Sequence, residues 1–225
     1  MRYDDICEGT FLARPNRFIA HVLIEGVPTV CHVKNTGRCR ELLLPGARVI
    51  LSRGANPLRK TAYDLISVYK GDRLINMDSQ SPNDIAEEYL PRLFPDVVAL
   101  RREVTWGDSR LDFYGTKGDG PFFLEVKGVT LERENHAYFP DAPTERGVKH
   151  LEELIRLKQA GIGAHVLFVV QMEGIDALSA NRETHPAFAD ALLAARDAGV
   201  DIHAVDCRVT PHTVTARAPV PIEYI

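Results

Sequence analysis

The sequence lacks the features that mark several special classes of protein. No apolar run approaches the ~18 residues of a membrane span, and no basic segment followed by an apolar one opens the chain as in a signal peptide. The four cysteines lack Cys-x-x-Cys spacing, and neither an internal repeat nor a low-complexity tract is present. A helix-turn-helix signature is missing as well. We therefore expect a cytoplasmic protein with reduced thiols that is not attached to a membrane.

The composition is that of an ordinary globular protein. The 225 residues suffice for one or two domains, and 45% of them are hydrophobic and 26% charged. The net charge of −4 hides an asymmetry, since residues 1–80 hold 12 Lys and Arg against 8 Asp and Glu, whereas residues 81–225 hold 15 against 23. A basic unit suits a phosphate backbone and an acidic unit suits metal ions, with scatter of surface charge as the alternative.

The first 80 residues alternate between apolar and polar positions in short runs separated by turn residues, which predicts strands. The expected strands cover residues 10–14, 17–25, 29–34, 47–53, 61–69 and 74–78, and Cys39–Leu44 is expected to form one helical turn. Such a pattern fits a small OB-fold-like barrel, with an SH3-like barrel as the alternative. A polar Ser-Pro segment indicates a domain boundary, so we assign residues 1–80 to a nucleic-acid-binding barrel and residues 81–225 to a second domain.

The pattern of the second domain is that of a mixed α/β sheet. We expect a helix over Pro82–Phe94 with Ser81 as its N-cap, a strand over 97–104 and a later helix over 187–198 followed by a strand over 200–205. The unbroken apolar run at 164–170 predicts a strand that is buried on both faces. The fold class is therefore an all-β barrel followed by an α/β domain.

The most informative stretch runs from Ser109 to Lys127. Both of its halves alternate with a period of two, and the glycine-rich segment Gly115–Gly120 between them suits a chain reversal. The predicted β-hairpin places Asp112, Glu125 and Lys127 on one face. Two carboxylates about 4 Å apart repel by roughly 4 kcal/mol at an effective dielectric of 20, and a hard divalent cation removes that repulsion. Mg²⁺ or Mn²⁺ with a phosphate suits this set, and a solvated face of mixed charges is the alternative.

A helix is expected between Thr144, its N-cap, and Gly161, which ends it. Its core stripe comprises Val148, Leu151, Leu154 and Ile155, and another face carries Arg146, Lys149, His150 and Glu153. That second face is either a solvated surface with a Lys149–Glu153 pair, or it brings Arg146 and Lys149 to a bound phosphate near the helix N-terminus.

Basic residues gather in the predicted loops and strand ends of the barrel. They are Arg14, Arg17, Lys34, Arg38, Arg40, Arg53, Arg59 and Lys60. Small barrels bind single strands with such cations, and the backbone of the Asn35-Thr36-Gly37 turn is a candidate anion nest, with a plain turn as the alternative. The aromatic residues Phe11, Phe18 and Tyr63 suit base stacking and a barrel core equally well.

Four segments carry a resemblance to a known family. They are Asn35-Thr-Gly-Arg38, Ser109-Arg-Leu-Asp-Phe113, Glu125-Val-Lys-Gly-Val-Thr-Leu131 and Tyr138-Phe-Pro-Asp-Ala-Pro-Thr-Glu-Arg-Gly-Val-Lys-His-Leu151. The chain resembles the sugar fermentation stimulation protein A (SfsA) family, and its hairpin resembles the PD-(D/E)xK nuclease core, although Leu111 stands where that motif has proline. The resemblance implies an OB-like N-terminal domain, a restriction-endonuclease-like C-terminal domain, DNA binding and a link to the regulation of sugar (maltose) utilisation.

We therefore predict that Asp112, Glu125 and the Val126 carbonyl hold one Mg²⁺ (or Mn²⁺). Lys127 is expected to orient a water molecule or to stabilise negative charge on the phosphate. Glu103 is a candidate further metal ligand, with a plain surface acid as the alternative. The nucleic-acid contacts are expected from Arg14, Arg17, Lys34, Asn35, Thr36, Gly37, Arg38, Arg40, Arg146 and Lys149. Tyr138, Asp141, Glu145 and His150 are candidate pocket residues, and Tyr138-Phe139 either stacks on a base or packs beneath its loop.

Three functions remain open from the sequence. The first is a DNA-binding protein with a Mg²⁺-dependent phosphodiesterase (endonuclease) site, which the lysine beside two acids favours. The second is a DNA-binding regulator of sugar metabolism genes that uses a nuclease-like fold without significant cleavage. The third is a module that binds a small molecule or a protein. A homodimer is left open in each case.

Overall fold

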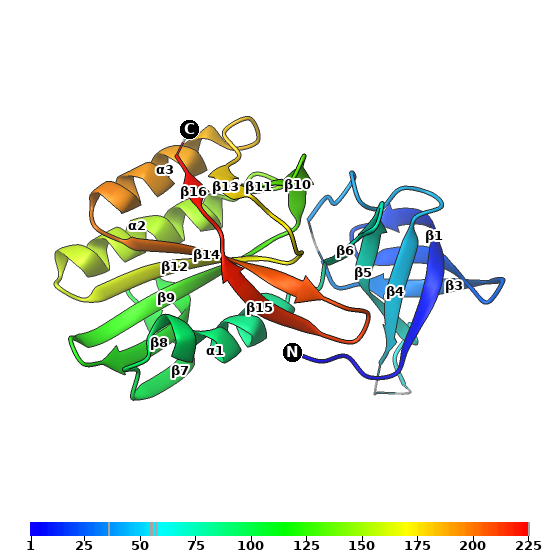
Figure 1. The fold of residues 1–225 in the computed structure, drawn as a ribbon, viewed down its shortest axis with the longest axis horizontal. Helices are drawn as coiled ribbons and strands as arrows, with labels where there is room; N and C mark the ends of the chain where they lie inside the picture. The colour runs from blue at the N-terminus through cyan, green and yellow to red at the C-terminus, as the bar shows by residue number, and fades with distance from the viewer. Residues whose placement is uncertain (36, 55, 57, 225) are drawn as a thin grey trace.

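The structure is a computed structural model that describes residues 1–35, 37–54, 56 and 58–224. Two units lie side by side: an N-terminal barrel, blue to cyan in Figure 1, and a larger C-terminal domain built around an open sheet. Within the described ranges, no helix combines the length and the apolar character that crossing a membrane would require.

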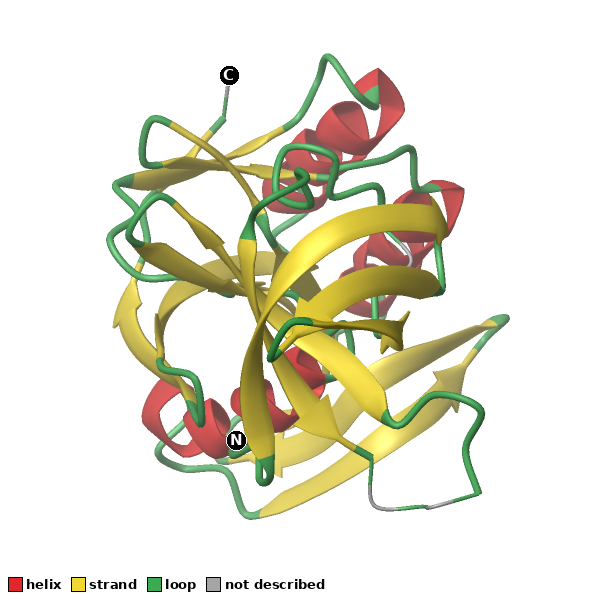
Figure 2. Ribbon diagram, turned by 90° about the vertical axis from the view of Figure 1, so that its right-hand side faces the viewer, coloured by secondary structure: helices red, strands yellow, loops and turns green. Residues whose placement is uncertain are grey.

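The N-terminal unit is the OB-fold-like barrel that the short alternating strands predict. Its strands are β1 (Ile6–Asn16), β2 (Ile19–Ile24), β3 (Val27–Val33), β4 (Arg48–Arg53), β5 (Tyr63–Lys70) and β6 (Arg73–Asn76). They pair in the order β3-β2-β1-β4-β5-β6, and a parallel pairing of β3 with β5 closes the barrel. Figure 2 views these curved strands from the barrel side. The closed five-strand arrangement is that of an OB fold, so the SH3-like alternative is set aside.

The helical turn expected at Cys39–Leu44 forms as a single turn and does not extend into a helix. The Leu43 N–H donates to the Cys39 carbonyl at 3.0 Å, which is the spacing of one α-helical turn, and residues 40–42 have turn geometry. Pro45 follows at once, and a proline disfavours the helical conformation of the residue before it, so the turn cannot propagate.

The C-terminal domain has the mixed sheet that the pattern predicts. Its strands are β7 (Ala99–Trp106), β8 (Ser109–Lys117), β9 (Gly120–Val129), β12 (Gly163–Val170), β14 (Asp201–Val209) and β15 (Val214–Pro219), in the order β15-β14-β12-β9-β8-β7. The pairs β9–β12 and β12–β14 are parallel and the others antiparallel. In Figure 1, α1 (Ser81–Leu93) covers one face, and α2 (Glu145–Gln159) and α3 (Pro186–Asp197) cover the other. The apolar run in β12 is buried, as expected for a strand between two helical layers.

The predicted N-cap is right for α2 and wrong for α1. The Thr144 hydroxyl accepts a hydrogen bond from the Gly147 N–H at 3.1 Å, which caps α2. At α1, by contrast, Gln80 is the N-cap and the helix begins at Ser81. The Ser81 hydroxyl donates instead to the Asn76 side chain at 2.8 Å, because it faces the junction between the two units.

A second, smaller sheet was not predicted. It consists of β10 (Leu131–Arg133), β11 (His136–Phe139), β13 (Ala177–Ala180) and β16 (Ile222–Glu223). These strands have only two to four residues, which is too short to show a period of two in the sequence.

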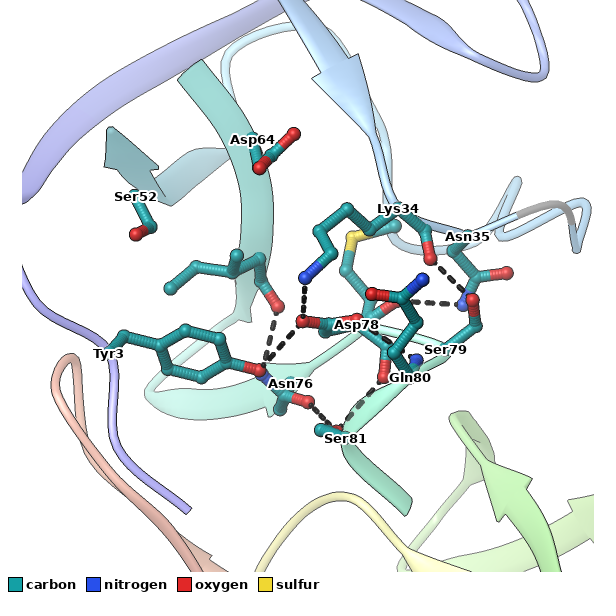
Figure 3. Close-up of polar contacts among 12 residues, drawn as sticks. Tyr3, Lys34, Asn35, Ser52, Asp64, Asn76, Asp78, Ser79, Gln80 and Ser81 are labelled. Carbon is teal, nitrogen blue, oxygen red and sulfur yellow. Dashed lines mark hydrogen bonds and ion pairs between the residues drawn. The ribbon is translucent and has the colours of Figure 1, made fainter. Parts of the chain in front are cut away.

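A buried polar network joins the two units at the linker (Figure 3). Asp78, which is fully buried, accepts hydrogen bonds from Lys34 Nζ at 2.7 Å and from the Tyr3 hydroxyl at 3.2 Å. Gln171 of the second unit donates to the Asn76 side chain at 2.8 Å. Since buried polar groups are costly without partners, these contacts fix how the barrel sits on the C-terminal domain.

The first residues of the chain also belong to this junction. Arg2 forms a β-bridge with Thr213, and the Tyr3 N–H donates to the His212 carbonyl at 2.8 Å. The N-terminus therefore lies against β15 of the C-terminal domain (Figure 1), although the sequence pattern assigned it to the barrel. Glu132 on β10 adds a second link, since it is buried between Lys70 and Arg73 of the barrel at 3.1 Å from each.

Candidate active site

The predicted hairpin forms and brings its two acids together. β8 and β9 pair from Phe113 and Leu124 to the turn at Lys117 and Gly120, and this backbone pairing ends just before Asp112. There the Asp112 side chain takes the place of a backbone partner, because its Oδ2 accepts from the Val126 N–H at 2.8 Å. Its Oδ1 accepts from the Asn83 side-chain amide at 3.0 Å, at the start of α1. Burial, and then the neighbouring Glu125 carboxylate, raise the pKa of the Asp112 carboxyl.

Glu125 is almost completely buried, with 3% of its surface exposed. Its Oε1 accepts a hydrogen bond from Lys127 Nζ at 2.6 Å and another from His150 Nδ1. Burial acts to raise the pKa of this carboxyl, but Lys127 and His150 outweigh burial and hold the pKa below its usual range. Glu125 therefore carries its negative charge inside the domain.

The second oxygen of Glu125 has an unusual environment. Oε2 is buried and has no hydrogen-bond partner among the described residues. A buried carboxylate oxygen without a donor is costly, and such groups are uncommon in folded proteins. The orphaned oxygen lies on the side chain that shares its site with Asp112, so the donor set suits a hard cation bound through oxygen.

His150 supports Glu125 from helix α2. Arg146 Nε donates to His150 Nε2 at 3.2 Å, so Nδ1 carries the proton that is donated to Glu125. Only 4% of His150 and 2% of Glu153 is exposed, whereas Arg146 and Lys149 on the same helix face are exposed, so that face is only partly solvated. The Lys149–Glu153 pair is also absent from the described contacts, because Glu153 pairs with Arg156 at 2.7 Å and Lys149 Nζ donates to the Asp108 carbonyl at 3.2 Å.

Glu103 lies apart from the hydrogen bonds around Glu125. It is the residue without a partner between the pairs Arg102–Phe113 and Val104–Leu111, where β7 bulges with a φ of 56°. Its exposed carboxylate lies 3.5 Å from Arg110. The structure thus places Glu103 in a surface ion pair.

Three of the predicted nucleic-acid contacts serve the fold instead. Arg14 donates to the carbonyls of Arg17, Asn35, Gly37 and Arg38 at 2.6–2.9 Å, so it holds the loop that follows β3. Lys34 neutralises the buried Asp78, and the Asn35 amide donates to the Met77 carbonyl at 2.9 Å. These donors are occupied by loop carbonyls and by the buried Asp78, contacts that no local pattern reveals.

The predicted anion nest is closed by side chains of the protein. The Gly37 N–H donates to Asn35 Oδ1 at 2.7 Å, and the Arg38 N–H donates to Asp141 Oδ2 at 3.1 Å. Thr36 lies outside the described residues. Asp141 therefore joins the loop to the C-terminal domain and is not directed at the Glu125 carboxylate.

Arg17, Arg38 and Arg40 remain exposed and surround a cavity of about 510 Å³. We call this the arginine cavity and define it by Arg14, Arg17, Arg38 and Arg40, together with Phe11 and Leu43. A second cavity of about 340 Å³, the interdomain cavity, lies between the units and is lined by Gly37, Pro82, Gly128, Asp141, Thr144 and Gln171, among others. Gly37 borders both cavities.

The remaining candidate pocket residues occupy separate places. Tyr138 packs on His136, with ring centroids 4.7 Å apart, and Glu145 is exposed 3.2 Å from His185 Nε2. Phe139 packs against Phe168 and Phe188, so of the two alternatives for this residue the structure favours packing within the fold. Among the residues that the structure describes, no three His, Cys, Asp or Glu side chains are grouped so that they alone could hold a metal.

Comparisons with known proteins agree with this architecture. The family model described as "SfsA N-terminal OB domain" matches residues 12–77, and the one described as "Sugar fermentation stimulation protein RE domain" matches residues 80–213. The sugar fermentation stimulation protein homolog of Desulfitobacterium hafniense is 52% identical over 226 residues, covering 100% of this chain and 99% of that protein. The homolog of Ruminiclostridium cellulolyticum is 51% identical over 211 residues, covering 93% of each.

The solved structure of Pyrococcus furiosus SfsA in complex with Ca²⁺ is also similar. It matches with a TM-score of 0.88 at 28% identity, and the match covers 99% of this chain and 98% of that one. The barrel and the sheet domain are thus arranged alike in the two proteins.

Proposed function

The chain belongs to the sugar fermentation stimulation protein family, and from this premise we propose that it is a DNA-binding protein with a metal-dependent phosphodiesterase site. The site comprises Asp112, Glu125 and Lys127. The observation that carries the proposal is the buried Glu125 Oε2, which has no hydrogen-bond partner among the described residues. This oxygen belongs to a side chain that lies near a second carboxylate, that of Asp112. A restriction-endonuclease-like domain with this set suits hydrolysis of a phosphodiester.

The residues present fit a divalent cation. Asp112, Glu125 and the Val126 carbonyl would hold Mg²⁺ or Mn²⁺, which would polarise the phosphodiester and lower the pKa of a bound water. Two carboxylates with a backbone oxygen are few ligands, and magnesium sites of this kind usually take water and phosphate oxygens as well. The Pyrococcus furiosus relative was solved in complex with Ca²⁺, another hard cation, which agrees with a divalent cation as the ligand class.

Lys127 supplies the positive charge that the reaction needs. Its ammonium lies 2.6 Å from Glu125 Oε1, and its side chain is 12% exposed, so it borders the site without being sealed from it. From there Lys127 stabilises negative charge that develops on the phosphate oxygens, or orients the attacking water.

His150 and Asn83 keep the two acids in place. His150 fixes one oxygen of Glu125, and Asn83 fixes one oxygen of Asp112, so each acid keeps a defined orientation. DNA would be held by the exposed Arg17, Arg38 and Arg40 of the barrel and by Arg146 and Lys149 at the start of α2.

A cleavage assay tests the proposal. Labelled DNA and RNA, single-stranded and duplex, are incubated with the protein in Mg²⁺, Mn²⁺ or EDTA. We expect metal-dependent cleavage that Asp112→Ala and Lys127→Ala abolish and that Asp119→Ala retains, since Asp119 is an exposed acid at the far turn of the same hairpin. Cleavage that is equal in the wild type and Asp112→Ala would refute the proposed phosphodiesterase site. DNA binding without any cleavage would favour a regulator of sugar metabolism genes with a nuclease-like fold.

A further inference from the structure

Phe18 is the one exposed phenylalanine among the residues that the structure describes. Phe18 is 44% exposed, whereas the other eight phenylalanines are buried or half-buried. It lies in the tight turn between β1 and β2, where the Arg17 guanidinium lies 4.8 Å from the centre of the ring. Arg17 stacks on one side of the ring, and the exposure of Phe18 leaves aromatic surface open to solvent.

The turn that carries Phe18 borders the arginine cavity. Asn16 and Arg17 are among the residues that line the cavity, and Arg38 and Arg40 face it from the connection between β3 and β4. Among its described lining residues, none is acidic. Because Arg14 ties both sides together through four backbone carbonyls, the cavity has a fixed shape before any ligand arrives.

The arginine cavity adjoins the interdomain cavity. Gly37 borders it on one side and the interdomain cavity on the other. The interdomain cavity reaches Gly128, the residue after Lys127, and Pro82, the residue before the Asn83 that holds Asp112. The two cavities are therefore neighbours, and the second adjoins residues next to the candidate site.

We propose that Phe18 and the arginine cavity form a subsite for an unpaired DNA strand, with one base stacked on Phe18 and phosphates on Arg17, Arg38 and Arg40. The inference rests on the proposed function and specifies its substrate as DNA with a single-stranded segment. The bases inside a duplex are stacked on each other, so only an unpaired base offers its face to an aromatic side chain. OB folds bind oligonucleotides mainly on the β2–β3 face with the β1–β2 and β4–β5 loops. This subsite shares the β1–β2 turn with that surface and adds β1 itself and the β3–β4 connection.

Fluorescence anisotropy in EDTA tests the subsite without cleavage. The probes are a labelled single-stranded 12-mer and a hairpin duplex of the same sequence, each titrated with the full chain at several salt concentrations. We expect tighter binding of the single strand, and a loss of about 5- to 100-fold in Phe18→Ala with an unchanged salt dependence. Arg38→Ala should lower the salt slope by about 0.7, since it removes one phosphate contact.

Val27→Ala is the matched control. Val27 is an exposed apolar residue at the opposite end of the β2–β3 hairpin, and we expect wild-type binding. Phe18→Trp should keep the affinity and should show quenching of its fluorescence by the single strand. The one native tryptophan, Trp106, lies on β7 of the other domain, so its signal is subtracted with the wild type.

Three results would overturn the subsite: equal affinity for the two probes, unchanged single-strand affinity in Phe18→Ala, or no quenching in Phe18→Trp. The same preparations are assayed for cleavage in Mg²⁺, so the two proposals fail separately. If Asp112→Ala loses cleavage while Phe18→Ala binds like the wild type, only the subsite is wrong. If Phe18→Ala loses binding while the wild type never cleaves, only the nuclease is wrong.

Discussion

The backbone N–H of Arg38 donates a hydrogen bond to the Asp141 carboxylate, 3.1 Å away and 103 residues further along the chain. This contact joins two of the segments by which the sequence resembles its family. It also places the exposed arginines of the barrel beside the loop that leads into α2, the helix that carries His150. The position of the barrel is thus coupled to that of the candidate active site around Glu125.

Gly37 should prove intolerant of a side chain because of this contact. A Cβ at this position would overlap the Asp141 carboxylate oxygen and the Asn35 side chain. We expect Gly37→Ala to lower the free energy of unfolding by about 1–3 kcal/mol, as overpacking does. Urea denaturation measures the loss. The double variant Gly37→Ala/Asp141→Ala should cost less than the sum of the two single variants, and simple additivity would show that the two residues do not meet.

Lys34 should matter for stability more than for DNA binding. Its removal leaves the fully buried Asp78 without its cation, which costs about 3 kcal/mol at such pairs. We expect Lys34→Ala to unfold at a lower urea concentration, and Asp78→Asn to recover part of the loss in the double variant. Lys60→Ala, at an exposed lysine, is the control. A Lys34→Ala protein as stable as the wild type would contradict the buried pair.

His150 should act on metal binding through Glu125. Residues that orient a metal ligand typically change metal affinity by about 10- to 100-fold when they are removed. We therefore expect His150→Ala to raise the Mn²⁺ concentration for half-maximal cleavage by that factor, with a smaller change in the rate at saturating Mn²⁺. His150→Asn, which keeps a donor, should lie closer to the wild type. An unchanged Mn²⁺ requirement in His150→Ala would assign this histidine to packing alone.

The protein should lose stability in weak acid because of His165. Burial lowers the pKa of His165 to about 4, with Asp201 opposing and His203, Lys117 and Lys158 adding to the shift. An unfolded histidine has a pKa of about 6.5, so between these values the unfolded chain binds more protons and stability falls as the pH falls. The slope from this residue approaches about 1.4 kcal/mol per pH unit.

Urea denaturation from pH 7 to pH 4.5 measures that slope. His165→Gln should have a flatter profile over this range, and His21→Gln, at an exposed histidine of β2, should keep the wild-type slope. Parallel profiles for His165→Gln and the wild type would show that the buried histidine does not set the acid limit.

Much of the fold follows from local patterns in the sequence. The hairpin, the buried strand β12 and the capped helix α2 each have a period, a cap or a turn within one segment, and each is found where it was expected. The approach of Glu125 to Lys127, and the contact of Asp112 with the backbone next to Glu125, follow from the hairpin in the same way.

The errors concern contacts between distant segments. Arg14 and Lys34 face inward because their partners are loop carbonyls and a buried acid, which no local pattern indicates. The burial of His150, by contrast, could have been predicted. His150 lies at helical spacing on the buried stripe of Gly147, Leu151 and Leu154, and this pattern is visible in the sequence. Asn83 gives no such signal, because its role depends on where the start of α1 meets β8.

The proposed activity requires a divalent cation held by Asp112 and Glu125, and calorimetric titration with Mn²⁺ tests this requirement most directly. We predict one binding site in the wild type and in Asp119→Asn, and its loss in Glu125→Gln and Asp112→Asn, with all four proteins folded by circular dichroism. Equal Mn²⁺ binding in the wild type and Glu125→Gln would contradict the proposed site.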